Sequence, residues 1–294
     1  MNDVMEKKDM KKYTKYKILD FIRTKLMCIV PDKLYLKIMY KLKTGHKLNL
    51  KNPERYTEKI QWLKLYNRNE GYTDYADKIK VRNIVEKKVG KEYLIPLLGI
   101  YDSFDDIDFE KLPDKFVLKC NHDSGSVIIC TDKKNFDYAY AKKKLEKALK
   151  CNYYIIGREY IYKNIDRKIM VEKYLDDLNG SAANDYKIFI VNGKLSHLEI
   201  CSDRFTNLKV TFFDKNKKRL NISEMGEEYD EKIQLPKEID KMIEIAKNIA
   251  SDIPLLRVDF YDVNGKIYFG IYTFVNKLKL KTTEVIPLFV ASLK

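Results

Sequence analysis

Hydrophobic and polar residues alternate with two different periods along this chain. Apolar residues recur at helical spacing in residues 53–67, 73–89, 137–150 and 236–250, which predicts a helix in each segment. The second helix is expected to begin at Thr73, as its N-cap, and to end at Gly90. Short apolar runs predict strands in "EYLIPLLGIY", "KFVLKC", "SVIIC" and "RKIMVEKYL".

Two predicted hairpins dominate the second half of the chain. The stretch "DYKIFIVNGKLSHLEI" turns at Asn192-Gly193, and "LLRVDFYDVNGKIYFGIYTF" turns at Asn264-Gly265. Asn-Gly between alternating hydrophobic residues is the strongest short hairpin signal. "LKVTFFDKNKKRL" adds a further strand and turn, and the helix at 236–250 lies between the hairpins in sequence. We therefore expect an α+β fold, with antiparallel sheet and a helix packed on it.

The first 50 residues combine lysines with apolar residues at helical spacing. One apolar stripe is expected from Ile18, Phe21, Ile22, Leu26, Ile29 and Val30, and a second from Leu34, Ile38, Met39 and Leu42. Two interpretations stay open. The helices either pack on the main body with a solvated basic face, or lie on an anionic membrane surface.

The composition narrows the classes of protein. The formal net charge of the 294 residues is +14, which favours acidic or phosphorylated partners. No motif typical of nucleic-acid recognition is present, and no apolar run reaches the ~20 residues that span a bilayer. The five cysteines are scattered and odd in number, which favours a reducing cytoplasm over a disulfide framework.

The stretch "KCNHDSGSVIIC", residues 119–130, is a candidate phosphate-binding loop. Lys119 ends a predicted strand, and Ser124, Gly125 and Ser126 allow the backbone to bend and expose N–H groups. The stretch is not a Walker A loop. Glycine and serine are also ordinary turn residues, so a plain hairpin remains the alternative.

Two further stretches carry charge on predicted strands. In "RVDFY", Arg257, Asp259 and Tyr261 share one face of a strand. Aspartate suits a metal ion and arginine a phosphate, and the alternative is a structural salt bridge. In "VEKYL", residues 171–175, Glu172 at a strand end could bind an adenine and its ribose, although alone it means little.

Taken together in this order, the motifs resemble those of the ATP-grasp enzymes. The chain is similar to the TupA-like branch, named for teichuronopeptide synthesis, of bacterial cell-surface polysaccharide proteins. The resemblance runs from about residue 31 to about residue 270, through "PDKLYLK", "LNLKNPERYTEKIQWLKLYNR", "EYLIPLLG", "FVLKCNHDSGSVIIC", "EKYL", "NDYKIFIVNGK", "SDRFTN" and "RVDFYDVNGKIYFG".

The resemblance implies two α+β lobes that clamp a nucleotide. We expect a basic amphipathic helical segment at 1–50, a helical and strand region at 51–112, a front lobe with the glycine-containing loop at 113–175, and a back lobe at 176–294. The sequence diverges from the family from about residue 271.

The resemblance also implies a role for individual residues and the cofactors ATP and Mg²⁺. Asp259 would bind magnesium and Arg257 would steady a phosphate or an acyl phosphate. The other expected contacts are Lys78, Lys119 and Lys187 to the phosphates, Ser124, Gly125 and Ser126 as their cover, Glu172 and Tyr174 to adenine and ribose, and Asp203, Arg204 and Asn207 to the acceptor or phosphates.

The activity implied is ATP-dependent ligation of a carboxylate to an amine. In this branch an amino acid would be joined to an acidic sugar or polymer precursor, in the cytoplasm or at the inner face of the membrane. The alternatives are a catalytically inactive nucleotide-binding or partner protein of polysaccharide assembly, a glycosyltransferase of the same pathway, and a small-molecule or sugar kinase. The fold does not choose among them.

The chain departs from the family where a metal-binding glutamate is expected. That position holds Ile271. A plain two-residue turn at Asn264-Gly265 would set Gly270 opposite Asp259, whereas a one-residue bulge would set Ile271 there, and the family implies the second register. The chain is then an inactive copy, a slow enzyme with one carboxylate, or one in which Glu284 substitutes.

Overall fold

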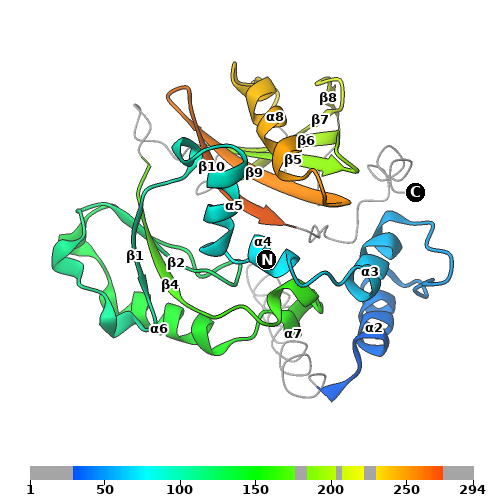
Figure 1. The fold of residues 1–294 in the computed structure, drawn as a ribbon, viewed down its shortest axis with the longest axis horizontal. Coiled ribbons are helices and arrows are strands. Elements are labelled where there is room, and N and C mark those ends of the chain that lie inside the picture. Colours follow the sequence, from blue (N-terminus) through cyan, green and yellow to red (C-terminus); the bar gives the residue numbers. More distant parts are fainter. Residues whose placement is uncertain (1–28, 176–183, 203–206, 222–229, 274–294) are drawn as a thin grey trace, which may run out of the picture.

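The fold consists of two antiparallel sheets with helices on their outer sides (Figure 1). The computed structural model describes residues 29–175, 184–202, 207–221 and 230–273. The helix α6 (Tyr138–Lys150) and the helix α8 (Ile239–Ile249) lie on opposite sides of the molecule, with the sheets between them. Within the described ranges, no helix has the length and apolarity needed to cross a membrane.

The first sheet has four strands in the order β1-β4-β2-β3. They are β1 (Leu97–Tyr101), β2 (Phe116–Cys120), β3 (Ile128–Cys130) and β4 (Ile169–Lys173), as the apolar runs predicted. Phe116, Leu118 and Cys120 alternate toward a core shared with Ala141 and Leu145 of α6. Because side chains alternate across a strand, Lys119 must lie on the face away from α6.

The second sheet has six strands in the order β10-β9-β5-β6-β7-β8. The strands are β5 (Asp185–Val191), β6 (Lys194–Ser202), β7 (Lys209–Asp214), β8 (Arg219–Leu220), β9 (Leu255–Val263) and β10 (Lys266–Thr273). Both Asn-Gly hairpins are confirmed, with positive φ at Asn192, Gly193, Asn264 and Gly265. The residues Ile188, Leu198 and Val258 pack with Met242 and Ala246 of α8, so the other face of the sheet is free for polar residues.

Short helices before and between the strands of the first sheet pack around the two sheets. These are α2 (Asp32–Thr44), α3 (Tyr56–Tyr66), α4 (Tyr72–Ala76) and α5 (Lys80–Lys88), with α7 (Tyr154–Gly157) and the 3₁₀ helices η3 (Lys91–Tyr93), η4 (Phe104–Asp106), η5 (Phe109–Lys111), η6 (Lys133–Asn135) and η7 (Tyr160–Tyr162) further along the chain. Tyr56, Ile60, Val81 and Val85 belong to the core of the second sheet. Segments before the first sheet thus help to complete the second.

The buried face of α2 differs from the predicted stripe. Leu34 and Leu42 are 51% and 67% exposed, whereas Tyr35 and Tyr40 are buried. The Tyr35 hydroxyl donates to the Ile156 carbonyl at 3.1 Å, and the Tyr40 hydroxyl hydrogen-bonds Thr57 at 2.9 Å. Tyrosines satisfy their polar tips while burying their rings, so they anchor this helix. The stripe from Ile18 to Leu26 lies outside the described residues.

The single helix predicted for residues 73–89 is wrong. The chain forms α4 and α5, separated at Asp77, which adopts an extended conformation with φ −80° and ψ 111°. The Asp77 carboxylate accepts hydrogen bonds from the N–H groups of Ile79 and Lys80 and from the Asn121 amide. An aspartate that caps backbone N–H groups offers an alternative to a continuous helix, and this break positions Lys78.

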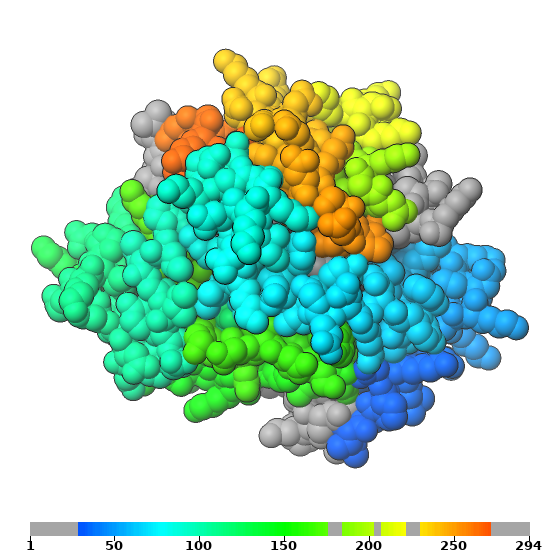
Figure 2. Space-filling model, viewed as in Figure 1, coloured from blue at the N-terminus to red at the C-terminus, as the bar shows by residue number. Residues whose placement is uncertain are grey.

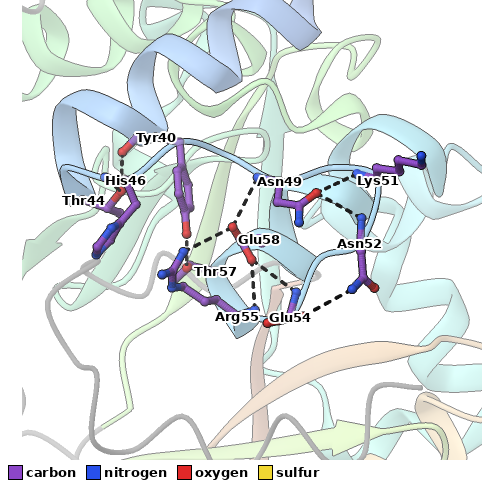
Figure 3. A network of polar contacts seen from close by, with 10 residues as sticks. All are labelled: Tyr40, Thr44, His46, Asn49, Lys51, Asn52, Glu54, Arg55, Thr57 and Glu58. Carbon is purple, nitrogen blue, oxygen red and sulfur yellow. Dashed lines mark hydrogen bonds and ion pairs between the residues drawn. The ribbon is translucent and has the colours of Figure 1, made fainter.

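The start of α3 is held by one buried carboxylate (Figure 3). The Glu58 side chain accepts hydrogen bonds from the backbone N–H groups of Asn49, Glu54 and Arg55 at 3.1–3.2 Å, and Arg55 also forms an ion pair with it at 3.5 Å. Glu58 is only 2% exposed. It therefore closes the connection between α2 and α3, as the glutamate of a capping box does.

We expect Glu58→Ala to lower the free energy of unfolding by about 3 kcal/mol, because three backbone donors lose a charged acceptor. Urea denaturation of the intact chain measures this. Glu54→Ala is the matched control, since Glu54 is exposed, and should change stability by less than about 0.5 kcal/mol. Equal effects of the two substitutions would contradict the assignment of the network to Glu58.

Candidate functional site

Two basic side chains converge on one carboxylate on the first sheet. The Lys119 ammonium lies 2.5 Å from Glu172 Oε2, and Arg82 Nη1 lies 3.3 Å from Glu172 Oε1. Arg82 also donates to the Ile95 carbonyl at 2.7 Å. Glu172 is 5% exposed, and the pairs Val117–Glu172 and Lys119–Met170 place it on the face opposite α6. This face therefore carries a compact cluster in which the cations outnumber the carboxylate.

Lys78 joins this cluster from the break between α4 and α5. Its backbone N–H donates to the Asn121 carbonyl at 3.0 Å, and its ammonium donates to the carbonyls of Cys120, at 2.9 Å, and of Asp123. Burial lowers the pKa of Lys78 to about 8, with Asp123 opposing the shift and the nearby Lys119 adding to it. Two cations, Lys78 and Lys119, thus lie beside the candidate loop.

The loop itself has a fixed base and an exposed tip. The Ser126 hydroxyl accepts a hydrogen bond from the Cys120 N–H at 2.8 Å and donates to Asp123 at 2.6 Å, and Ser126 is 2% exposed. Ser124 and Gly125 are exposed. Gly125 has φ +141° with open space where a Cβ would lie, so its backbone, and not packing, requires glycine. The role of this tip as a phosphate cover stays a prediction.

The second sheet aligns its polar residues in a regular grid on the face away from α8. Strand pairing places the candidate residues Lys187, Arg257 and Asp259 in adjacent rows across β6, β5, β9 and β10. The three rows are Cys201–Asp185–Tyr261–Tyr268, Glu199–Lys187–Asp259–Ile271 and His197–Phe189–Arg257–Thr273.

The cations of this grid are paired with carboxylates. Arg257 Nε and Nη2 each lie 2.7 Å from an oxygen of Asp259, and the Lys187 ammonium lies 3.0 Å from Glu199 and also contacts the Cys201 thiol. Burial lowers the pKa of Lys187, but Glu199, Cys201, Asp259 and Asp185 together outweigh burial, and the net shift is upward. Burial raises the pKa of Asp259, and Arg257 opposes that rise. Both cations therefore stay charged on a buried face.

Ile271 lies directly opposite Asp259. The register between β9 and β10 shifts between Phe269 and Ile271 because Gly270 is bulged, so the predicted bulge is confirmed and the register that would set Gly270 opposite Asp259 is excluded. The ideal Cβ of a residue at 270 would lie 3.1 Å from the Asp259 carbonyl, which favours glycine at the bulge. The place where the resemblance implies a metal-binding carboxylate is thus filled by an aliphatic side chain.

Tyr162 interacts electrostatically with residues of both clusters. Burial raises the pKa of its phenol, the carboxylates of Glu159, Asp123 and Asp259 add to the rise, and Arg257 opposes it. Because such interactions weaken with distance, Asp123 of the loop and Asp259 of the second sheet both lie in the neighbourhood of this phenol. The front and back groups of candidate residues are therefore near one another.

The remaining candidates are less closely grouped. Tyr174 follows β4, half-buried, with the Lys115 ammonium 5.8 Å from its ring centre. Asn207 is exposed just before β7. Asp203 and Arg204 lie outside the described residues.

Sequence reasoning missed four residues that the structure brings into the clusters: Arg82, Glu199, Cys201 and Tyr162. Glu199 could have been found from its alternation with His197 and Cys201 in "SHLEIC". Its partner could not, because β6 carries its own bulge between Leu195 and His197. Without this bulge, the hairpin that turns at Asn192-Gly193 would have paired Lys187 with Leu198.

A family model described as TupA-like ATPgrasp matches residues 58–282. The chain therefore belongs to the TupA-like ATP-grasp family, and the predicted family and the α+β fold with two antiparallel sheets are confirmed. Comparison with curated proteins gave no match.

Several solved structures are similar to this chain at low identity. D-alanine–D-alanine ligase from Bacillus anthracis is 17% identical, with a TM-score of 0.43, over 72% of this chain and 59% of that chain. L-amino acid ligase from Bacillus licheniformis is 13% identical, with a TM-score of 0.46, over 85% of this chain and 56% of that chain. The ATP-grasp ligase PsnB, solved with a minimal precursor variant, Mg and ADP, is 8% identical, with a TM-score of 0.44, over 81% of this chain and 66% of that chain. The chain thus spans less than two thirds of the length of these proteins.

The charged side chains of the candidate site suit the phosphates of a nucleotide better than they suit a metal ion. Lys78, Lys119, Lys187 and Arg257 supply the cations that phosphates require. For magnesium the grid offers Asp259, both of whose oxygens are held by Arg257, opposite Ile271. Among the described residues, no group of three histidine, cysteine, aspartate or glutamate side chains is arranged to hold a metal ion. The position directly opposite Asp259 on β10 therefore supplies no second carboxylate for magnesium.

Proposed function

We propose that this chain binds ATP between its two sheets and acts as an ATP-dependent ligase of a carboxylate and an amine, with weakened turnover. The observation that carries the proposal is the match of the family model to residues 58–282. The clustering of Lys78, Lys119, Lys187 and Arg257 around the loop and the grid supports it. Ile271 opposite Asp259 is the reason to expect weak activity.

The proposed reaction has two steps. A carboxylate oxygen of one substrate attacks the γ-phosphorus of ATP, and ADP leaves. The nitrogen of an amine then attacks the carbonyl carbon of the acyl phosphate, phosphate leaves, and a proton is lost from the nitrogen. Fixed cations neutralise charge on the transferring phosphoryl group, which is the main demand of such chemistry. Lys119, Lys187 and Arg257 would supply that charge. Each would exchange its present carboxylate partner for a phosphate oxygen.

We propose ATP and Mg²⁺ as the cofactors, and an acidic sugar or polymer precursor and an amino acid as the substrates. Magnesium can be held by one carboxylate together with phosphates, so Asp259 would be its protein ligand here. The net charge of +14 supports an acidic partner. The branch resemblance supports a role in cell-surface polysaccharide assembly in the cytoplasm.

An anionic membrane surface is a further proposed partner. On α2, Leu34, Ile38 and Leu42 recur every four residues and are exposed by 51%, 37% and 67%. Lysines 33, 37 and 41 are exposed beside them. An apolar stripe flanked by lysines is typical of helices that lie on anionic lipid. This surface also favours the alternative of an inactive partner protein in polysaccharide assembly. The glycosyltransferase and kinase alternatives have no observation of their own.

Calorimetric titration with ATP and magnesium tests the proposed function. We expect micromolar-to-millimolar binding near pH 7 that weakens about tenfold by pH 9, because a Lys78 with a pKa of about 8 loses its charge over this range. Lys78→Arg should remove most of this pH dependence, since arginine stays protonated.

Unfolding of the chain on deprotonation of Lys78 would not explain the expected decrease in ATP affinity. The pKa of Lys78 is lower in the folded chain than the ordinary lysine value of 10.5. The unfolded chain then binds more protons above pH 8, and this lysine makes the free energy of unfolding rise with pH there. Absence of ATP binding at any pH, together with flotation of the chain on anionic liposomes, would instead support the inactive partner protein.

A further inference from the structure

A small, largely apolar recess lies near the candidate nucleotide site. It opens to solvent between α3, η7 and the start of β9, and its enclosed part measures about 30 Å³. Its walls include Leu63, Ile161 and Leu255, and its polar lining includes Lys64, Asn67 and Glu159. In Figure 2 the light-blue chain around α3 and α4 lies between the green chain near η7 and the orange start of β9. No residue of this recess was predicted as functional from the sequence.

Glu159 is the unusual group in this recess. It is 7% exposed, and burial raises its pKa while Lys64 opposes the shift. Among the residues that the structure describes, its carboxylate has one polar partner, the Lys64 ammonium at 3.5 Å. That distance exceeds a normal hydrogen bond, and the ammonium also donates to the Gly157 carbonyl at 3.1 Å. Buried carboxylates normally accept several hydrogen bonds, so this one has unused acceptor capacity toward the recess.

The recess adjoins the residues proposed to handle the phosphoryl group. Leu255 and Arg257 lie two residues apart on the same face of β9, a separation of about 7 Å. Tyr162, which directly follows the lining residue Ile161, is near enough to interact electrostatically with Glu159, Arg257 and Asp259. A molecule held at Glu159 would therefore lie next to the site where an acyl phosphate would form.

We propose that this recess binds the amine substrate as a small amino acid, with its ammonium group on Glu159. The inference rests on the proposed ligase function and names the site of its second substrate. Lys64 places a positive charge beside the carboxylate, so the recess offers one charge of each sign to a zwitterion. The aliphatic walls favour a short apolar side chain over a long charged one.

Ligand-observed saturation-transfer NMR on the intact chain tests this inference with L-alanine, L-alanine methyl ester and propionate. Alanine and its ester carry the ammonium and are expected to bind, whereas propionate, which lacks it, is not. Glu159→Gln should weaken alanine binding at least about tenfold, because the charge-assisted hydrogen bond is lost. Glu244→Gln is the matched control on the exposed surface of α8 and should change nothing.

Glu159→Gln leaves Lys64 without its carboxylate partner, so this variant could fail to fold. A second variant therefore tests the recess independently. Asn67→Phe adds bulk to the lining but keeps both charges, and it should also weaken alanine binding. ATP titration of each variant separates this inference from the proposed function. Unchanged ATP binding with lost alanine binding supports the recess. Equal binding of propionate and alanine, or full alanine binding by Glu159→Gln, would overturn it. Alanine binding that depends on Glu159 without any ATP binding would keep the ammonium site and reject the ligase.

Discussion

Ile271→Glu is expected to raise the ATP-dependent turnover of this chain by about 100-fold. The bulge at Gly270 sets residue 271 opposite Asp259, so a glutamate there would place a second carboxylate beside the first. Magnesium relies on one or two carboxylates plus phosphates, and the present chain supplies one that is shared with Arg257. Release of phosphate from ATP, followed as a function of magnesium concentration, measures the change. The variant should also reach half-maximal rate at lower magnesium.

Two controls separate the position from the charge. Ile271→Gln keeps the length of the new side chain without its charge, and should gain little. Tyr268→Glu places a carboxylate one row away, opposite Tyr261, where it should not assist Asp259. If the wild-type chain already turned over ATP as fast as Ile271→Glu, the missing carboxylate would have no catalytic consequence, and a slow or inactive enzyme would no longer be expected.

The element types were predictable because their signals are local. Asn-Gly turns, alternation in the strands and the apolar stripe of α8 each involve residues close in sequence, and these predictions are confirmed. The helix boundaries were less accurate. The start expected at Pro236 lies at Ile239, and the break at Asp77 depends on Asn121, a residue 44 positions away. A contact at that separation leaves no periodic trace in the sequence.

The candidate site was predictable as a set of residues but not as a set of pairs. Lys119, Lys187, Arg257 and Asp259 were named from the sequence, and the structure places them on the face of the first sheet away from α6 and on the face of the second sheet away from α8. Two of the pairings, Lys187 with Glu199 and Asp259 with Ile271, depend on bulges that each shift the register by one residue. Gly270 marks the bulge in β10, since glycine in a strand often indicates one. No comparable residue marks the bulge at Ser196, so the Lys187–Glu199 pair could not be derived.

Lys119→Met is expected to weaken ATP binding about 100-fold, equivalent to about 2.7 kcal/mol. Lys119 is a largely buried cation whose ammonium is 2.5 Å from Glu172, and a phosphate would take over that position. Removing the ammonium deletes a charge-assisted hydrogen bond to the phosphate. It also leaves the Glu172 carboxylate without its nearest cation, so that this carboxylate repels the bound anion. Calorimetric titration with ATP measures the loss, and circular dichroism of the same samples shows whether the variant is folded.

Two further variants show whether a loss of ATP affinity in Lys119→Met is due to the missing charge at this position. Lys119→Arg keeps the charge and should lose less affinity than Lys119→Met. Lys142→Met removes a lysine that forms an exposed ion pair with Asp105 at 2.6 Å, and exposed pairs contribute little, so ATP binding should not change. Unaltered affinity in Lys119→Met would make the Lys119–Glu172 pair a structural salt bridge of the first sheet. The phosphates would then have to be held by Lys78, Lys187 and Arg257 alone, which would move the nucleotide toward the second sheet.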